Sequence, residues 1–151
     1  WERIQRLYWD HFEDSLTGPV PGMAPLVDDI LAAGAPLYAL TNFNDVLFAA
    51  SRRLMPQLAR FHGVVVSGAE HLVKPDPALY RLLLTRYGLD PARTLFVDDS
   101  PANIDGARSV GLRTHLFTGA GALRAALADA GLLPPRRHRS AERAESTATA
   151  P

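Results

Sequence analysis

The sequence predicts an α/β protein in which a parallel sheet is flanked by helices. Segments with helical patterns alternate with short strand-like segments along most of the chain. The strand-like segments are apolar runs, as expected of parallel strands that are buried on both faces. Two of these runs are followed directly by polar residues and then by a residue that can begin a helix. Such connections favour one parallel sheet with helices on both sides.

The N-terminal segment, residues 1–14, has apolar side chains at helical spacing. They are Ile4, Leu7, Tyr8 and Phe12. This spacing predicts a helix with one buried face. A break rich in proline and glycine follows at residues 17–22 and separates this helix from the rest of the chain.

The predicted elements then follow in order. The strands are 36–40, 63–66, 94–97 and 113–117, and the helices are 24–33, 45–59, 76–86, 101–110 and 122–130. Glycines end several of these helices, and Asp76-Pro77 and Ser100-Pro101 begin two of them. The last residues, 133–151, contain almost no large apolar side chain and are expected to be disordered.

Composition excludes several classes of function. The formal net charge is zero, so no strong field favours nucleic acid or an anionic membrane. The basic cluster at 136–139 could touch nucleic acid, but a solvated tail is the better interpretation because acids and small residues follow it. Cysteine is absent, which excludes disulfides and thiol catalysis. No apolar run is long enough to span a bilayer and no export signal is evident, so a cytoplasmic location is expected.

The most informative stretch is an apolar run, 95–97, that stops on two adjacent carboxylates. Asp98 and Asp99 end the predicted strand, and Ser100 begins the next helix. Two like charges this close are costly unless a cation lies between them. Mg²⁺ is a hard cation that prefers carboxylate oxygens, so this pair predicts a magnesium site. The alternative is a pair of acids that complements a helix N-terminus.

Three further polar residues belong to the same predicted edge of the sheet. Thr41 and Asn42 follow strand 36–40, where a hydroxyl, an amide and backbone N–H groups can hold a phosphate. Asn103 lies in the first turn of the helix after the acid pair, where it can orient a carboxylate or a metal-bound water. The alternative for both asparagines is ordinary helix-start chemistry, with Asn42 or Asn44 capping the following helix.

Lys74 is the sole lysine of the sequence, because every other cationic side chain of the Lys and Arg type is arginine. A compact ammonium neutralises phosphate and carboxylate as a point charge, whereas a guanidinium imposes a planar fork. Pro75 restricts Lys74 to an extended conformation just before a helix. The carboxyl ends of parallel strands share one edge, so Lys74 is expected beside the acid pair. The alternative is an ordinary exposed lysine.

These segments, in this order, resemble the haloacid dehalogenase-like (HAD) hydrolase superfamily. Thr41 in YALTN is similar to its second motif, Lys74 in VKPDPALY to its third, and Asp98-Asp99 in FVDDSPANIDGARSVG to its fourth. The likeness extends from about Pro21 to Leu132. Within the superfamily, the chain is most similar to small phosphatases such as the glucose-1-phosphate phosphatase and the N-terminal domain of soluble epoxide hydrolase.

The resemblance implies a magnesium-dependent phosphatase of small phosphorylated metabolites that acts through an aspartyl-phosphate intermediate. It implies that Thr41 and Asn42 bind the phosphoryl oxygens and that Lys74 neutralises the charge of phosphate and nucleophile. Asp99 would bind Mg²⁺ directly. Asp98 would bind Mg²⁺ through a metal-bound water or orient Lys74. Asn103 would support the carboxylates and waters around the metal.

The first motif of the family, a DxD segment at the end of an apolar strand, is not found in the chain. Asp10 and Asp14 lie in the N-terminal helical stretch, and Asp28-Asp29 lies inside a predicted helix. The resemblance therefore implies that residues 1–18 are the last helix of a helical cap and that 19–132 are a Rossmann-like core lacking its first central strand, with 133–151 as a tail. The missing strand would come before this chain in sequence. In the sheet it would lie between the strands that end at Thr41 and Asp98.

Three functions remain open at this point. The first is the phosphatase, inactive in this chain alone because it lacks the nucleophile. The second is a 2-haloacid dehalogenase-type hydrolase, which needs no metal. The third is a non-catalytic HAD-like binding module. Neither the substrate nor the oligomeric state can be inferred from the sequence, and no nucleic-acid or membrane partner is expected.

Overall fold

Helices and parallel strands alternate through the part of the chain that the structure, a computed structural model, describes: residues 18–134. The helices are α2 (Met23–Ala32), α3 (Asp45–Ser51), α4 (Ser67–Glu70), α5 (Pro77–Tyr87), α6 (Pro101–Ser109) and α7 (Ala120–Asp129), and the strands are β1 (Tyr38–Thr41), β2 (Gly63–Val66), β3 (Leu95–Asp98) and β4 (Arg113–Leu116). The predicted α/β class is confirmed. The predicted cap helix and nearly all of the predicted tail lie outside the described residues.

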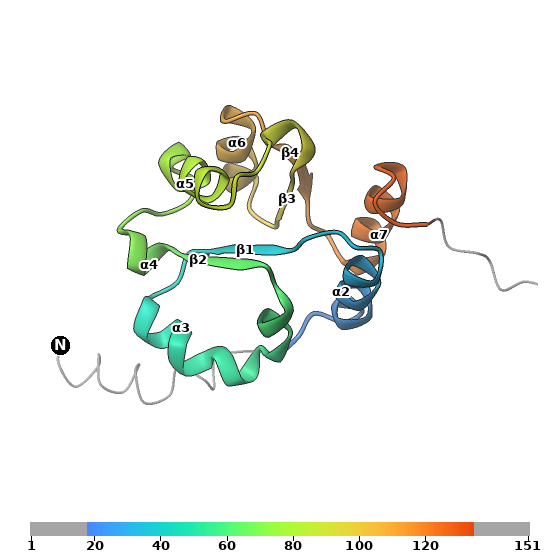
Figure 1. Ribbon diagram of the computed structural model, residues 1–151, viewed down its shortest axis with the longest axis horizontal. Helices are drawn as coiled ribbons and strands as arrows, with labels where there is room; N and C mark the ends of the chain where they lie inside the picture. Colours follow the sequence, from blue (N-terminus) through green and yellow to red (C-terminus); the bar gives the residue numbers. More distant parts are fainter. Residues whose placement is uncertain (1–17, 135–151) are drawn as a thin grey trace, which may run out of the picture.

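The strands form two parallel pairs. β1 pairs with β2, which places Thr41 opposite Val66, and β3 pairs with β4, which places Asp98 opposite Leu116. The two pairs are not joined by a strand ladder within residues 18–134. In Figure 1 the β1–β2 pair crosses the middle of the molecule, with α3 on one side and α5, α6 and the β3–β4 pair on the other. The family resemblance implies a further strand between β1 and β3, and this strand stays a prediction.

Three apolar clusters hold these elements together. The first joins α2 and α7, which lie side by side in Figure 1, through Leu26, Ile30, Leu123 and Leu127, with Leu133 beside them. The second packs α5 and α6 against β3, and the third packs α5 against β2. Helix α5 therefore contacts both strand pairs. Its position fixes the loop that precedes it, which carries Lys74.

The predicted helix over 45–59 is too long. Helix α3 ends at Ser51, and the chain continues in two 3₁₀ turns, Arg52–Leu54 and Pro56–Arg60. Pro56 explains the break at Met55 between the two turns, because a proline disfavours the helical conformation of the preceding residue. Met55 accordingly has φ −126° and ψ 58°. The short helix α4 was not predicted, since four residues give no readable period.

The other helices predicted within residues 18–134 agree with the structure to within two residues at each end. Asp76 caps α5 by accepting a hydrogen bond from the backbone N of Ala78 at 2.8 Å. Gly88 ends α5 in the left-handed conformation with φ 61°, which glycine adopts without strain. Ser100 is the N-cap of α6, with Pro101 at its start. Among the described residues, no helix is long and apolar enough to cross a membrane.

Candidate active site

The predicted site residues gather where β1 and β3 end. Thr41 is the last residue of β1 and Asp98 is the last residue of β3. Lys74 lies in the loop between α4 and α5, and its ammonium reaches both strand ends. The carboxyl ends of parallel strands are where open α/β sheets bind ligands. The structure thus brings together residues that are distant in sequence.

A buried ion pair lies at the centre of the site. Lys74 Nζ lies 2.7 Å from Asp98 Oδ2, and the two side chains are 9% and 8% exposed. The ammonium also donates to the carbonyl oxygen of Leu40 at 3.0 Å and lies 5.7 Å from the centre of the Phe96 ring. The lysine is therefore not an ordinary exposed one, because its charge is balanced within the protein.

The Asp98 carboxylate is fully engaged. Its Oδ1 accepts from the backbone N of Ser100 and from Asn103 Nδ2, both at 2.9 Å. Burial by itself raises the pKa of Asp98, but hydrogen bonds from Lys74, Asn103 and Ser100, together with the Lys74 charge, outweigh it. The pKa of Asp98 therefore lies below its usual value. The group is an anion that holds the ammonium and the start of α6 in place.

The other predicted site residues, Asp99, Thr41 and Asn42, are not part of the Lys74–Asp98 ion pair. Asp99 follows β3 and its side chain is exposed, in contrast to buried Asp98. Thr41 is partly exposed and comes directly after Leu40, whose carbonyl accepts from Lys74. Asn42 does not cap α3; its carboxamide hydrogen-bonds the backbone of Lys74, while Asn44 is the N-cap of α3. The structure thus decides between the two capping candidates.

Sequence analysis did not identify two residues that support the site, Tyr80 and Gly106. Tyr80, fully buried in α5, donates from its hydroxyl to the backbone O of Asn103 at 2.8 Å and meets the Phe96 ring edge-on at 5.3 Å. Burial, with a smaller effect from the Asp98 charge, raises the pKa of Tyr80 to about 12, so the phenol stays neutral. Gly106 lets α6 approach the lysine loop, because a Cβ there would lie 2.5 Å from the carbonyl oxygen of Pro75.

The donor set at this edge fits a magnesium ion. Two carboxylates are adjacent here, and the exposed one, Asp99, is free of the hydrogen bonds that occupy Asp98. Within residues 18–134 no group of three or more His, Cys, Asp or Glu side chains gathers for a metal. Mg²⁺ does not need such a cage, since it is usually held by one or two carboxylates, waters and substrate phosphate. The residues present would thus supply part of a coordination shell.

A parallel α/β core with a lysine, an acid pair and polar strand ends at one edge defines a class of hydrolase. Comparison with protein families makes the assignment: residues 2–111 match the model for haloacid dehalogenase-like hydrolases. The chain belongs to this family. The resemblance inferred from the sequence is thereby confirmed.

Two curated relatives and one solved structure are similar to about two thirds of this chain. The mouse acyl-CoA dehydrogenase family member 10 is 34% identical over 67% of this chain and 9% of its own length. Phosphatase MT3486 of Mycobacterium tuberculosis is 31% identical over 69% of this chain and 48% of its own length. A HAD family enzyme from Bacteroides thetaiotaomicron, solved as a magnesium complex, is 26% identical over 66% of this chain and 52% of its own, with a TM-score of 0.56. The chain thus spans less than half the length of the two curated relatives.

Proposed function

We propose that the complete protein is a magnesium-dependent phosphatase of small phosphorylated metabolites. By the complete protein we mean a chain that adds an upstream strand ending in a nucleophilic aspartate to the residues described here. The observation that carries the proposal is the buried Lys74–Asp98 pair at the shared ends of β1 and β3. The similarity to phosphatase MT3486 supports a phosphate ester as the substrate, and the family assignment supports hydrolysis.

The proposed reaction has two steps. In the first, the P–O bond to the leaving alcohol breaks while a P–O bond to the aspartate carboxylate forms, and the leaving alkoxide takes a proton from solvent water. In the second, water attacks phosphorus and gives a proton to solvent, the P–O bond to the aspartate breaks, and inorganic phosphate leaves as the carboxylate is regenerated. Both steps concentrate negative charge on the phosphoryl oxygens, so fixed cations and donors must be in place beforehand.

The residues of this chain supply part of that stabilisation. The Thr41 hydroxyl would donate to a phosphoryl oxygen at the end of β1. Lys74 would neutralise the charge of phosphate and nucleophile, and its pairing with Asp98 fixes the ammonium before substrate arrives. Asp99 would hold Mg²⁺, which when bound would add positive charge beside the phosphoryl group. Asp98 would orient Lys74, with Asn103 supporting its carboxylate.

Removal of the metal separates the phosphatase from a dehalogenase of the same family. We expect excess EDTA to abolish p-nitrophenyl phosphate turnover by the complete protein and added Mg²⁺ to restore it, because the charge on the phosphoryl group would lose its divalent counter-ion. Turnover of 2-chloropropionate that EDTA leaves unchanged would contradict the proposal and favour the dehalogenase. The absence of both activities would favour a non-catalytic module.

The isolated 151-residue chain is expected to be poorly stable and inactive. All four residues of β1 are only partly buried, although a central parallel strand should be buried on both faces. Among the described residues β1 and β3 each have a single ladder partner, which leaves one edge of each strand unpaired there, and unpaired edges favour aggregation. Thermal melting and a phosphatase assay test this expectation. A cooperative melt together with p-nitrophenyl phosphate turnover by the isolated chain would overturn it.

A further inference from the structure

The carboxamide of Asn42 hydrogen-bonds both polar groups of the Lys74 backbone. Asn42 Oδ1 accepts from Lys74 N at 2.8 Å, and Asn42 Nδ2 donates to Lys74 O at 2.9 Å. The two residues are 32 positions apart. The Asn42 side chain thus hydrogen-bonds the Lys74 backbone as the backbone of a neighbouring strand would. It ties the loop after β1 to the loop before α5.

The position of this backbone decides where the ammonium lies. Lys74 Nζ must reach the carboxylate of Asp98 and the carbonyl of Leu40 at the same time, at 2.7 and 3.0 Å. A lysine stem has four rotatable bonds, so the ammonium can reach many positions around a given Cα. Holding the Lys74 backbone fixes the point from which the stem reaches Leu40 and Asp98, so a shift of this backbone would move the ammonium away from both acceptors.

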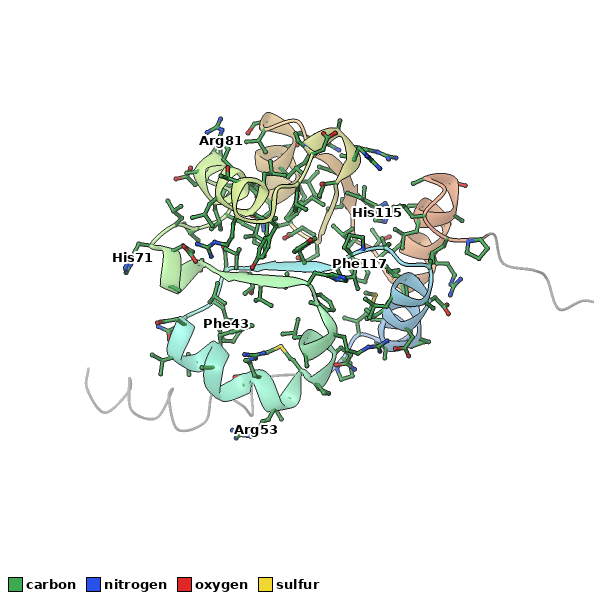
Figure 2. The ribbon with its side chains drawn as sticks, in the orientation of Figure 1. Phe43, Arg53, His71, Arg81, His115 and Phe117 are labelled. Carbon is green, nitrogen blue, oxygen red and sulfur yellow. The ribbon has the colours of Figure 1, made fainter. Side chains whose placement is uncertain are left out.

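The residue after Asn42, Phe43, is held in place by hydrogen bonds with two residues that follow β2, Ser67 and Gly68. The buried hydroxyl of Ser67 accepts from Phe43 N at 3.0 Å and lies 3.2 Å from Phe43 O, to which it donates. Gly68 N also donates to Phe43 O, at 3.0 Å. A Cβ on Gly68 would lie 2.9 Å from that oxygen, so only glycine permits this approach. Figure 2 shows Phe43 between α3 and the strand pair, where its ring meets Phe48.

We propose that Asn42 is a positioning residue, which sets the place of the Lys74 ammonium instead of acting by contact with phosphate. A chain of side-chain to backbone bonds then runs from Ser67 through Phe43 and Asn42 to Lys74. This inference rests on the proposed phosphatase function, and it assigns Asn42 a different role from the one the family resemblance implies. The ammonium is placed before substrate binds, which is what charge stabilisation in a transition state requires.

The test compares Asn42→Ala with Asn44→Ala in the complete protein. Asn44 is a matched control, because its carboxamide oxygen also takes part in two hydrogen bonds, from Val46 N at 3.0 Å and Leu47 N at 3.1 Å, yet it has no bond to Lys74. The first readout is the acetylation rate of the Lys74 amine, followed by mass spectrometry of the peptide that contains it. The second is kcat and KM for p-nitrophenyl phosphate with Mg²⁺.

Asn42→Ala removes both hydrogen bonds to the Lys74 backbone and should raise the acetylation rate of Lys74 by about fivefold to thirtyfold, the factor that corresponds to one to two net hydrogen bonds. It should lower kcat by about tenfold to a hundredfold with little change in KM, because a displaced charge acts mainly on the transition state. Asn44→Ala should leave both readouts near wild type. Asn42→Asp, which keeps the acceptor for Lys74 N and loses the donor to Lys74 O, should be intermediate and serves if the alanine variant does not fold.

A wild-type acetylation rate in both Asn42 variants would overturn the proposal, and so would equal effects of Asn42→Ala and Asn44→Ala. A raised KM with unchanged acetylation would show that Asn42 acts by direct contact with phosphate. If the wild-type protein turns over no phosphate ester, the proposed function fails. The acetylation rates still decide whether Asn42 positions Lys74.

Discussion

Replacing Asp99 with asparagine is expected to reduce kcat/KM of the complete phosphatase by about a thousandfold, since a lost metal ligand removes several kcal/mol of charge stabilisation. Asp99 is the exposed member of the acid pair, and Asp98 is already occupied by Lys74, Asn103 and Ser100. The amide has nearly the same shape as the carboxylate. The loss should therefore appear in activity and in magnesium affinity, with little change in stability.

The control for this variant is Asp105→Asn. Asp105 lies on α6 close to the site in sequence, and its side chain is 74% exposed and pairs only weakly with Arg108 at 3.0 Å. We expect wild-type turnover from it. Steady-state assays over a range of Mg²⁺ concentrations compare the two variants. Unchanged turnover in Asp99→Asn at limiting Mg²⁺ would remove Asp99 from the site, and equal losses in both variants would point to an effect of charge on α6.

The sequence was sufficient to predict that Thr41, Lys74 and Asp98 belong to one edge of the sheet. Thr41, Lys74 and Asp98 each follow or end a segment whose type is readable from apolar runs and helix-start residues. Topology then places them together, because parallel strands share one carboxyl edge. The proximity of Lys74 and Asp98, at 2.7 Å, agrees with that reasoning.

What the side chains contact could not be predicted in the same way. Asn42 was expected to face phosphate, yet it bonds a loop residue 32 positions away, and no local pattern records such a contact. Tyr80 is indistinguishable in sequence from an ordinary core aromatic until its hydroxyl is seen 2.8 Å from Asn103 O. The end of α3 was misjudged because the apolar pattern continues past Pro56 while the backbone does not. These features depend on three-dimensional packing, which tertiary context decides.

Lys74→Met in the complete protein is expected to lower the free energy of unfolding at pH 7 by about 3–5 kcal/mol, the cost of leaving a buried charge without its partner. Methionine keeps much of the apolar stem, so the change is mainly the loss of the ammonium. The Asp98 carboxylate, 8% exposed, would then keep only Asn103 and the backbone of Ser100 as partners. Urea unfolding in EDTA measures the difference without a contribution from bound metal.

The lowered pKa of Asp98 predicts how the stability difference between wild type and Lys74→Met changes with pH. The folded-state pKa of Asp98 lies below that of the unfolded chain, so the pair stabilises the protein fully above about pH 4, the unfolded carboxyl value. That contribution is lost as the pH falls through the lower, folded-state pKa. The stability difference between wild type and Lys74→Met should therefore be largest near neutral pH and shrink in acid.

Two further variants separate charge pairing from general damage. Lys74→Met combined with Asp98→Asn removes both charges and should recover part of the lost stability, because no buried anion remains. Arg81→Met removes an exposed cation from the outer surface of α5, where Figure 2 shows its side chain pointing away from the molecule, and should change stability by less than about 0.5 kcal/mol. A difference between wild type and Lys74→Met that is small at pH 7, or constant down to pH 3, would mean that the pair does not stabilise this edge of the sheet.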